Sequence, residues 1–197
     1  MKEQKKTIVV ATGNAYKLRE IAEIFPDYRF VSQKEAGFLG EVEETGVTFS
    51  ENALLKAQAV AKALSIPALA DDSGICVDAL GGAPGVYSAR YAGEHGDDQK
   101  NRDLLLENLK GETNRRAYFC SAIALCYPDG THYITEGKTY GEILLQEEGT
   151  GGFGYDCIFK NEDLNKSFGL ATPEEKNAVS HRYRALVALK ELLGGKL

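Results

Sequence analysis

The sequence has little of several features that mark special classes of protein. Its 197 residues include no tryptophan, one methionine and only five prolines. Because the prolines are widely spread and no repeat or Pro/Ser-rich linker occurs, we expect one continuous domain over residues 1–197. No stretch approaches the roughly 18 apolar residues that would span a bilayer, so no membrane partner is expected.

Cysteine is also scarce, and its spacing is not that of a metal or redox motif. The four cysteines, none of them in a C-x-x-C pair, are Cys76, Cys120, Cys126 and Cys157. They lie in apolar or aromatic stretches, so we interpret them as buried free thiols. The chain starts with polar residues and shows no apolar signal region. Together these features predict a soluble, cytoplasmic protein.

Basic residues are fewer than acidic residues. There are 23 Lys and Arg residues against 29 Asp and Glu, which gives a net charge of −6. This balance excludes the basic footprint of a protein that binds polymeric nucleic acid. It still allows a small anionic ligand, because a local site can oppose the global charge. The histidines, His95, His132 and His181, are scattered, so any metal is expected to be a hard cation such as Mg²⁺.

The features that the sequence does contain are alternating strand and helix patterns. A buried strand over residues 7–11 precedes a helix that stops at Pro26, and a capping box at Thr48 opens a second helix. Residues 116–127 and 131–145 are β-rich and joined by Pro-Asp-Gly, a hairpin signal. Further strands are expected at 67–70, 75–80 and 153–159, and further helices after 97 and from 180. Thr172-Pro173-x-Glu175 predicts a second capping box, which opens another helix after 172. Crossover and hairpin connections together predict an α/β fold with a mixed sheet.

The turn after the first strand is the first candidate site. It reads Thr12-Gly13-Asn14-Ala15-Tyr16-Lys17. A strand that delivers a small polar turn to a helix N-terminus aims backbone N–H groups at an anion, and Lys17 adds a charge. The alternative is an ordinary strand–turn–helix with Asn14 as N-cap and Lys17 in solvent.

Two acidic segments form the second candidate. Asp71-Asp72-Ser73-Gly74 follows an apolar strand, and because neighbours in a strand alternate faces, one Asp is expected in a site and the other in structural contacts. A plain turn is the alternative. Glu43 or Glu44, from the acidic run before the second helix, together with Asp72 suits Mg²⁺, which takes one or two carboxylates and substrate phosphates. That run is otherwise a solvated loop, and Glu51 is expected to be a capping residue.

A glycine-rich segment near residue 150 matches G-x-G-x-x-G, but it leads into a strand pattern and not into the helix of a dinucleotide site. We interpret it as a turn that presents Phe153 and Tyr155 to a flat heterocycle, with Gly154 between them and Asp156 as a polar edge contact. The alternative is that both rings belong to the core.

Basic side chains also meet at a helix start near the C-terminus. They are Lys176, His181 and Arg182, with Ser180 as the cap. This geometry can bind an anion or a carbonyl group. Alone, the segment is more typical of an amphipathic helix surface.

Taken together, these segments resemble the inosine/xanthosine triphosphate pyrophosphatase family. The matching stretches, in chain order, are Ala11-Thr12-Gly13-Asn14 with Lys17 and Glu20, Glu44-Thr45-Gly46 with Phe49 and Glu51-Asn52-Ala53, Ala70-Asp71-Asp72-Ser73-Gly74, Gly85 with Ser88-Ala89-Arg90-Tyr91, Gly152-Phe153-Gly154-Tyr155-Asp156, and Ser180-His181-Arg182. Each stretch is weak alone, but six in order are specific. Cys157 stands where the family often has proline.

The resemblance implies a long mixed sheet with two α/β lobes, a nucleotide cleft between them, a homodimer and Mg²⁺ dependence. It implies hydrolysis of ITP, dITP, XTP and dXTP to the monophosphate and pyrophosphate, which removes deaminated purines from the nucleotide pool. Glu44 and Asp72 would hold Mg²⁺, and Asp72 would activate water. The substrate-binding residues would be Thr12, Gly13, Asn14, Ala15, Tyr16, Lys17, Ser73, Phe153, Gly154, Tyr155, Asp156, Lys176, His181 and Arg182. Two alternatives remain: a pyrophosphatase with another base preference, and a nucleotide-binding module without catalysis.

Overall fold

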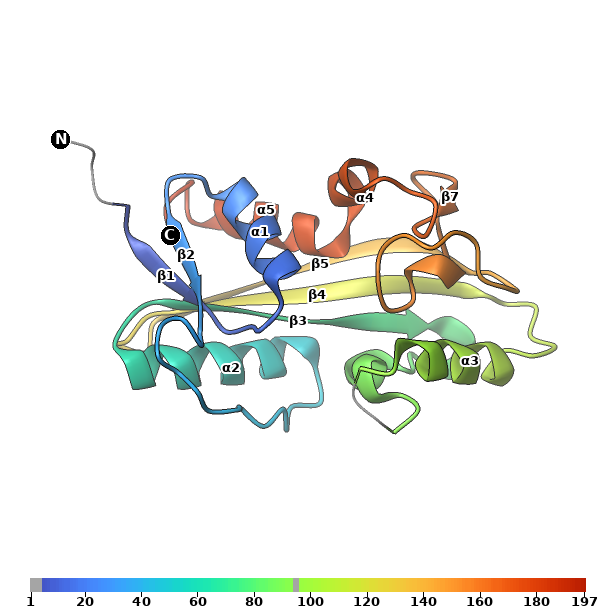
Figure 1. The fold of residues 1–197 in the computed structure, drawn as a ribbon, viewed down its shortest axis with the longest axis horizontal. Coiled ribbons are helices and arrows are strands. Elements are labelled where there is room, and N and C mark those ends of the chain that lie inside the picture. Colours follow the sequence, from blue (N-terminus) through green and yellow to red (C-terminus); the bar gives the residue numbers. More distant parts are fainter. Residues whose placement is uncertain (1–4, 94–95) are drawn as a thin grey trace. The chain divides into compact units, whose positions relative to one another are not determined.

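The computed structural model describes residues 5–93 and 96–197 (Figure 1). These residues divide into two compact units. Unit 1 comprises residues 5–72, 121–137 and 183–197, and unit 2 comprises the described residues of 73–120 and 138–182. The chain passes between the units at residues 72–73, 120–121, 137–138 and 182–183, so each unit is assembled from distant parts of the sequence.

The described strands form one mixed sheet. Their order is β2-β1-β3-β4-β5-β6-β7. Their bounds are β1 (Thr7–Val10), β2 (Arg29–Ser32), β3 (Ala68–Val77), β4 (Arg116–Cys126), β5 (His132–Ile143), β6 (Phe159–Asn161) and β7 (Lys166–Ser167). β1 runs parallel to β2 and β3, whereas β5, β6 and β7 pair antiparallel. The predicted α/β class and mixed sheet are therefore confirmed.

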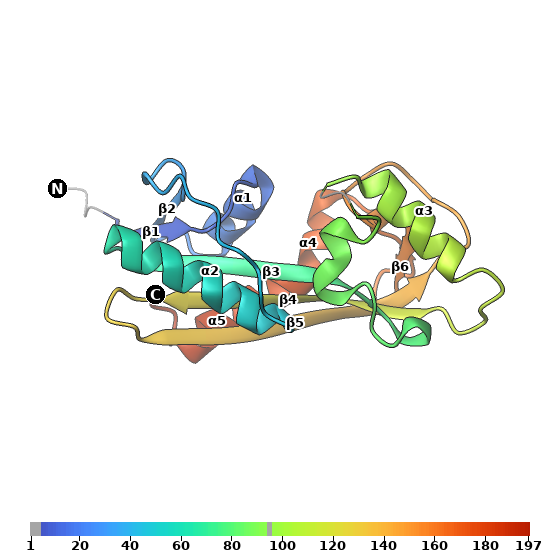
Figure 2. The same ribbon diagram turned by 90° about the horizontal axis from the view of Figure 1, so that it is seen from below.

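Helices cover both faces of the sheet in unit 1. The helices of the described chain are α1 (Ala15–Ile24), α2 (Phe49–Leu64), α3 (Asp98–Asn108), α4 (Pro173–Val179) and α5 (His181–Leu192). In unit 1, α1 and α5 lie on one face and α2 on the other (Figures 1 and 2). Ile21 of α1 and Leu186 of α5 share a core with Leu69 of β3, all fully buried. On the opposite face α2 buries small residues, Ala53 and Ala57, which let it approach the strands closely.

Unit 2 has an aromatic core. Phe119 and Phe159 meet edge to face with ring centroids 4.8 Å apart, and Phe168 packs against both. Leu105 and Leu109, from α3 and its C-terminal end, complete this cluster. Truncating either leucine to alanine would remove about 2–5 kcal/mol of stability through lost burial and a residual cavity.

Two expected segments differ from the structure. Asp71-Asp72-Ser73-Gly74 is neither a turn nor a strand end but the middle of β3, which ends at Val77 and is followed by a 3₁₀ turn. Sheet pairing on β4 overrides the turn propensity of these residues. The strand expected at 153–159 is also wrong. A 3₁₀ turn occupies Asp156–Ile158, and β6 starts only at Phe159. Positive φ angles at Gly152 and Gly154 break extension before it.

Other expectations are confirmed. Both predicted capping boxes form, at Thr48 and at Thr172. The hairpin turn closes through the N–H of Tyr127 and the carbonyl of Thr131, 2.8 Å apart. All four cysteines are free and buried. Across the described ranges, no helix combines the length and apolar character needed to cross a membrane.

Candidate active site

The turn after β1 is ordered by its own side chains. Oδ1 of Asn14 accepts hydrogen bonds from the N–H groups of Tyr16 and Lys17, at 2.9 and 3.4 Å, and caps α1. The N–H of Asn14 donates to Oγ1 of Thr12 at 3.0 Å. The predicted N-cap is therefore confirmed. Gly13, Ala15 and Tyr16 are exposed, which leaves this helix N-terminus open to an anion.

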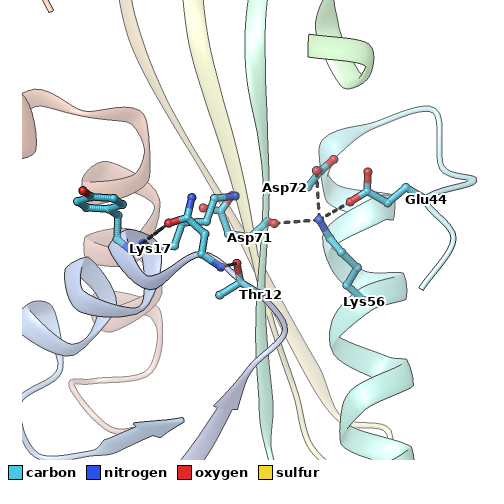
Figure 3. A network of polar contacts seen from close by, with 8 residues as sticks. Thr12, Lys17, Glu44, Lys56, Asp71 and Asp72 are labelled. Carbon is cyan, nitrogen blue, oxygen red and sulfur yellow. Dashed lines mark hydrogen bonds and ion pairs between the residues drawn. The ribbon is translucent and has the colours of Figure 1, made fainter. Parts of the chain in front are cut away.

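Lys17 is not a solvated surface lysine. Its side chain is only 20% exposed, and Nζ lies 3.4 Å from Oδ1 of Asp71. The Asp71 carboxylate is almost completely buried, so the ion pair holds the lysine at the edge of the turn (Figure 3). The alternative in which Lys17 stands in solvent is wrong, because β3 supplies a partner that is 54 residues away.

A lysine bridges two carboxylates on the other side of β3. Nζ of Lys56 donates to Oε1 of Glu44 at 2.6 Å and to Oδ1 of Asp72 at 3.2 Å. It also donates to the backbone carbonyl of Asp71 at 3.0 Å (Figure 3). Glu43 is exposed, whereas Glu44 turns inward. Of the two glutamates left open by the sequence, Glu44 is thus the one beside Asp72.

Strand geometry explains why the two aspartates have different partners. β1 pairs with β3 at Ala68 and Leu69 and then ends, so Asp71 and Asp72 come just past its last residue. Consecutive side chains of a strand point to opposite faces. Asp71 therefore meets Lys17 from α1, and Asp72 meets Lys56 from α2. The expected division of the pair between two faces is confirmed.

The loop that carries Glu44 is fastened to the start of α2. The N–H of Gly46 donates to Oδ1 of buried Asn52 at 2.8 Å, and the N–H groups of Val47 and Thr48 donate to Glu51. Glu51 is thus a capping residue, as predicted. A Cβ on Gly46 would lie 2.7 Å from Oδ1 of Asn52, so this close approach requires glycine. The helix thereby sets the position of Glu44 relative to Lys56 on its next turn.

Burial and charge compete at Asp72. Burial raises its pKa above the ordinary 3.8, Lys56 pulls it down, and Glu44 pushes it up, with a net rise. At Lys56, burial alone would lower the pKa, but Asp72 and Glu44 outweigh it and raise the pKa above 10.5. Lys56 is therefore a permanent cation, while Asp72 is shifted toward the range useful for a general base.

Glu44 and Asp72 fit a divalent cation with few protein ligands. Oδ2 of Asp72 is buried and has no hydrogen-bond partner among the described residues, so one carboxylate oxygen is left over for a ligand. Within those same residues no group of three or more His, Cys, Asp or Glu side chains forms a metal cage. His95 lies outside the described residues. A hard cation that completes its sphere with water and phosphate oxygens suits such a pair.

In unit 2 the glycine-rich turn presents one aromatic ring, not two. The ring of Phe153 is 47% exposed, whereas Tyr155 is buried and donates its hydroxyl to the carbonyl of Ser88 at 2.7 Å. The expectation that both rings face a ligand is therefore wrong for Tyr155, whose ring joins the core. Asp156 is buried, and its Oδ2 accepts from the N–H of Phe153 and from Nζ of Lys176.

The basic residues near the C-terminus are not on an ordinary helix surface. α4 ends at Val179, Ser180 interrupts, and α5 begins at His181. His181 and Arg182 are only 6% and 3% exposed. The imidazole of His181 stacks on Phe119, with centroids 5.0 Å apart. Polar side chains are seldom buried so fully, so this segment is not the solvated helix surface that the sequence alone favours.

Lys56 was not singled out from the sequence, and Asn52 was quoted only within a stretch that matches the family, with no role assigned to it. The buried side of α2 includes Phe49, Asn52, Ala53, Ala57 and Val60. Asn52 and Lys56 interrupt this apolar stripe at helical spacing, and Lys56 is 16% exposed. Polar residues inside a buried stripe need partners, and that signal could have marked both.

The fold and these side chains define an α/β protein with two features. One is a strand–turn–helix whose open helix N-terminus suits an anion, and the other is a pair of carboxylates bridged by a lysine. The chain belongs to the Ham1 family, whose family model matches residues 8–192. The resemblance drawn from the sequence is thereby confirmed at the level of the family.

Relatives and solved structures agree with this assignment. A protein of Streptomyces coelicolor named dITP/XTP pyrophosphatase is 49% identical, covering 95% of this chain and 98% of the relative. A Shigella flexneri protein of the same name is 48% identical, with 94% and 97% covered. The structure of the Staphylococcus aureus Ham1 protein superimposes with a TM-score of 0.90 at 44% identity, covering 96% of this chain and 99% of that one.

Proposed function

We propose that this protein hydrolyses non-standard purine nucleoside triphosphates, namely ITP, dITP, XTP and dXTP, to the monophosphate and pyrophosphate. The observation that carries the proposal is the lysine-bridged pair of Glu44 and Asp72, with a spare buried oxygen on Asp72. Near-full-length relatives with the name dITP/XTP pyrophosphatase supply the substrate class.

The triphosphate is assigned to the residues of unit 1. Thr12, Gly13, Asn14, Ala15 and Tyr16 form the open helix N-terminus, and Lys17 adds a positive charge beside it. Glu44 and Asp72 would hold Mg²⁺, which when bound polarises the phosphates and neutralises their charge. Lys56 keeps the two carboxylates together and adds a second fixed cation.

Asp72 is the proposed general base. We assign Oδ2, which has no hydrogen-bond partner among the described residues, to the proton from water, and Oδ1, which faces Lys56, to the metal. The raised pKa of Asp72 strengthens it as a base. Water attacks the α-phosphorus, the bond to the bridging oxygen breaks, and pyrophosphate leaves. Ser73 follows Asp72 in β3 and is assigned to substrate contact.

The purine is assigned to residues of unit 2. The exposed ring of Phe153 would stack on the base, with Gly154 and Asp156 beside it. Lys176, His181 and Arg182 would serve as donors toward a 6-oxo group and the phosphates. A 6-amino group is itself a donor, and such a mismatch can reject a substrate by about 10⁴. Tyr155 would support this loop through its hydroxyl and backbone and not by stacking.

Three expectations stay predictions: the nucleotide cleft of a single two-lobed domain, the homodimer and the cytoplasmic location. Sedimentation velocity tests the dimer. A homodimer should sediment as a species of two chains at micromolar concentration. Cell fractionation tests the location.

Hydrolysis in H₂¹⁸O with Mg²⁺ tests the reaction. Attack at the α-phosphorus places ¹⁸O in inosine monophosphate, whereas label in pyrophosphate, or release of diphosphate, contradicts it. A panel that includes ATP, GTP and modified pyrimidine triphosphates separates this activity from another base preference. Asp27→Asn, at an exposed position in the same unit, is the control for Asp72→Asn. Nucleotide binding without turnover would identify a binding module instead.

A further inference from the structure

Helix α3 holds both polar groups of one residue in the Phe153 loop. Oδ2 of Asp98 accepts a hydrogen bond from the N–H of Gly154 at 2.9 Å. Nη1 of Arg102 donates to the carbonyl oxygen of Gly154 at 2.8 Å. Asp98 and Arg102 are four residues apart, so they lie on the same face of the helix. Both the N–H and the carbonyl group of Gly154 are thus hydrogen-bonded to side chains of one helix.

Arg102 is itself fixed before it reaches the loop. Its Nε donates to Oε1 of Glu147 at 2.7 Å, and its Nη2 donates to Oε1 of Gln99 at 2.9 Å. The side chain is only 14% exposed. The hydrogen bond from Arg102 lowers the pKa of Glu147, so the pair stays charged at neutral pH. A guanidinium held in this way presents a directed donor to the loop.

The same loop is held from its other side. Oδ2 of Asp156 accepts the N–H of Phe153 at 2.8 Å and Nζ of Lys176 at 2.6 Å. A Cβ on Gly152 would collide with the Asp156 carboxylate, and Gly154 has φ +60°. The backbone on both sides of Phe153 is therefore pinned, while its ring stays 47% exposed. Nζ of Lys176 lies 4.5 Å from the centroid of that ring.

We propose that Asp98 and Arg102 are positioning residues that hold the Phe153 ring ready to stack on the purine. The inference rests on the proposed function, because it takes Phe153 as the base-stacking residue. Asp98 and Arg102 act through the Gly154 peptide and do not touch the substrate. A loop that is already ordered loses little conformational entropy when the nucleotide binds. The two hydrogen bonds to Gly154 should therefore strengthen nucleotide binding more than they speed the chemical step.

The absence of tryptophan from the chain allows a direct measurement of the loop. In Phe153→Trp the introduced indole is the single reporter of this position. We expect high steady-state anisotropy without nucleotide, and a fall in anisotropy with a rise in acrylamide quenching when Asp98→Ala or Arg102→Met is added. Arg102→Lys keeps a donor and should recover part of the anisotropy.

Two matched controls lie on the same helix. Lys100→Gln removes a positive charge that pairs with Asp97. Glu107→Gln removes an exposed carboxylate that pairs with Lys110. Neither should change the indole signal. With Phe153 in place, Asp98→Ala and Arg102→Met should each raise KM for ITP about tenfold, the effect of one lost charge-assisted hydrogen bond, with kcat within about twofold.

The outcomes separate this inference from the proposed function. If the wild type hydrolyses none of the nucleotides, the proposed function fails, but the anisotropy still reports whether α3 orders the loop. The inference is overturned if the indole in Asp98→Ala and Arg102→Met behaves as in the controls. It is also overturned if these variants lose thermal stability or kcat while KM stays at the wild-type value, since that result indicates a merely structural role.

Discussion

The ammonium nitrogen of Lys56 lies 3.2 Å from Oδ1 of Asp72, on the face of β3 opposite the Lys17–Asp71 pair. The two side chains come from a helix and a strand that are separated by a loop after residue 64. This contact ties the proposed base to a permanent charge and leaves its second oxygen without a partner among the described residues. A change at either residue should therefore alter the behaviour of the other.

Asp72→Asn should lower kcat by about 10²- to 10⁴-fold, the usual contribution of a general base. In metal-free protein the same variant should be more stable than wild type at neutral pH. Burial raises the pKa of Asp72, so the folded state holds this proton more tightly than the unfolded chain. Its contribution to stability therefore falls as pH rises from 3.8 toward the raised value. Asparagine stays neutral at every pH, so the variant does not lose this contribution to stability.

Thermal melts at pH 4 and pH 7, with EDTA, measure the effect. The gain from Asp72→Asn over wild type should be larger at pH 7. Asp27→Asn, at an exposed position, should show no such difference. A variant that is less stable than wild type at pH 7 would mean that the attraction to Lys56 outweighs burial.

Removing the charge of Lys56 and removing the charge of Glu44 should move the pKa of Asp72 in opposite directions. Lys56→Met removes the charge that lowers this pKa, so the pKa should rise further. Glu44→Gln removes a charge that raises it, so the pKa should fall. Carbon-13 NMR titration of the Asp72 carboxyl group in metal-free protein measures both shifts. The exposed Lys62→Met, on the same helix, should leave the titration unchanged.

Lys56→Met should also destabilise the fold by about 3 kcal/mol, because it leaves two carboxylates without their shared cation. Urea denaturation measures this loss. A cost equal to that of Lys62→Met would contradict the bridging role of Lys56.

Lys17→Ala should weaken the binding of ITP more than the binding of inosine monophosphate. Lys17 stands by the helix N-terminus that is assigned to the triphosphate, and the monophosphate product carries fewer charges for it to meet. Calorimetric titrations with both nucleotides give the two affinities, with Asp72→Asn as the background that prevents turnover. Lys34→Ala, at an exposed position, should alter neither affinity. Equal losses for both nucleotides would contradict the triphosphate assignment.

Two glycines should respond differently to alanine. At Gly46 the new Cβ would lie 2.7 Å from both Asn52 Oδ1 and Glu51 Cβ, so the loop with Glu44 must shift. We expect a loss of about 1–3 kcal/mol of stability together with weaker Mg²⁺ activation. At Gly13 nothing lies within 4 Å, so stability should be unchanged. There the methyl group would project beside the proposed phosphate site, and KM for ITP should rise. Calorimetry and Mg²⁺-dependent rates separate the two effects.

Much of the local structure could be predicted from residues that act on their immediate neighbours. The capping boxes at Thr48 and Thr172 and the Asn14 cap all formed, because each needs only three or four consecutive residues. Predictions failed where a distant strand decided the outcome. The Asp71 to Gly74 segment reads as a turn by composition, but sheet pairing extends it as the middle of β3.

The candidate site shows the same division. Asp72 and Glu44 were found as acidic residues in suitable places, and the family resemblance marked them as metal ligands. Lys56 was not found, although it interrupts the apolar stripe of α2. The prediction that Phe153 and Tyr155 both face a ligand holds only for the exposure of Phe153, since the ring of Tyr155 is in the core of unit 2.

By itself the sequence determined the α/β class, the capped helix starts, the free thiols and the family, because capping, periodicity and motif order each depend on short stretches of chain. Only the tertiary structure decided that Asp71 and Asp72 serve opposite faces, that Glu44 and not Glu43 meets Lys56, and that α3 grips the Phe153 loop. Those contacts join residues separated by 12 to 56 positions. They depend on where β1 ends and on how each helix packs against its unit, which no local pattern records.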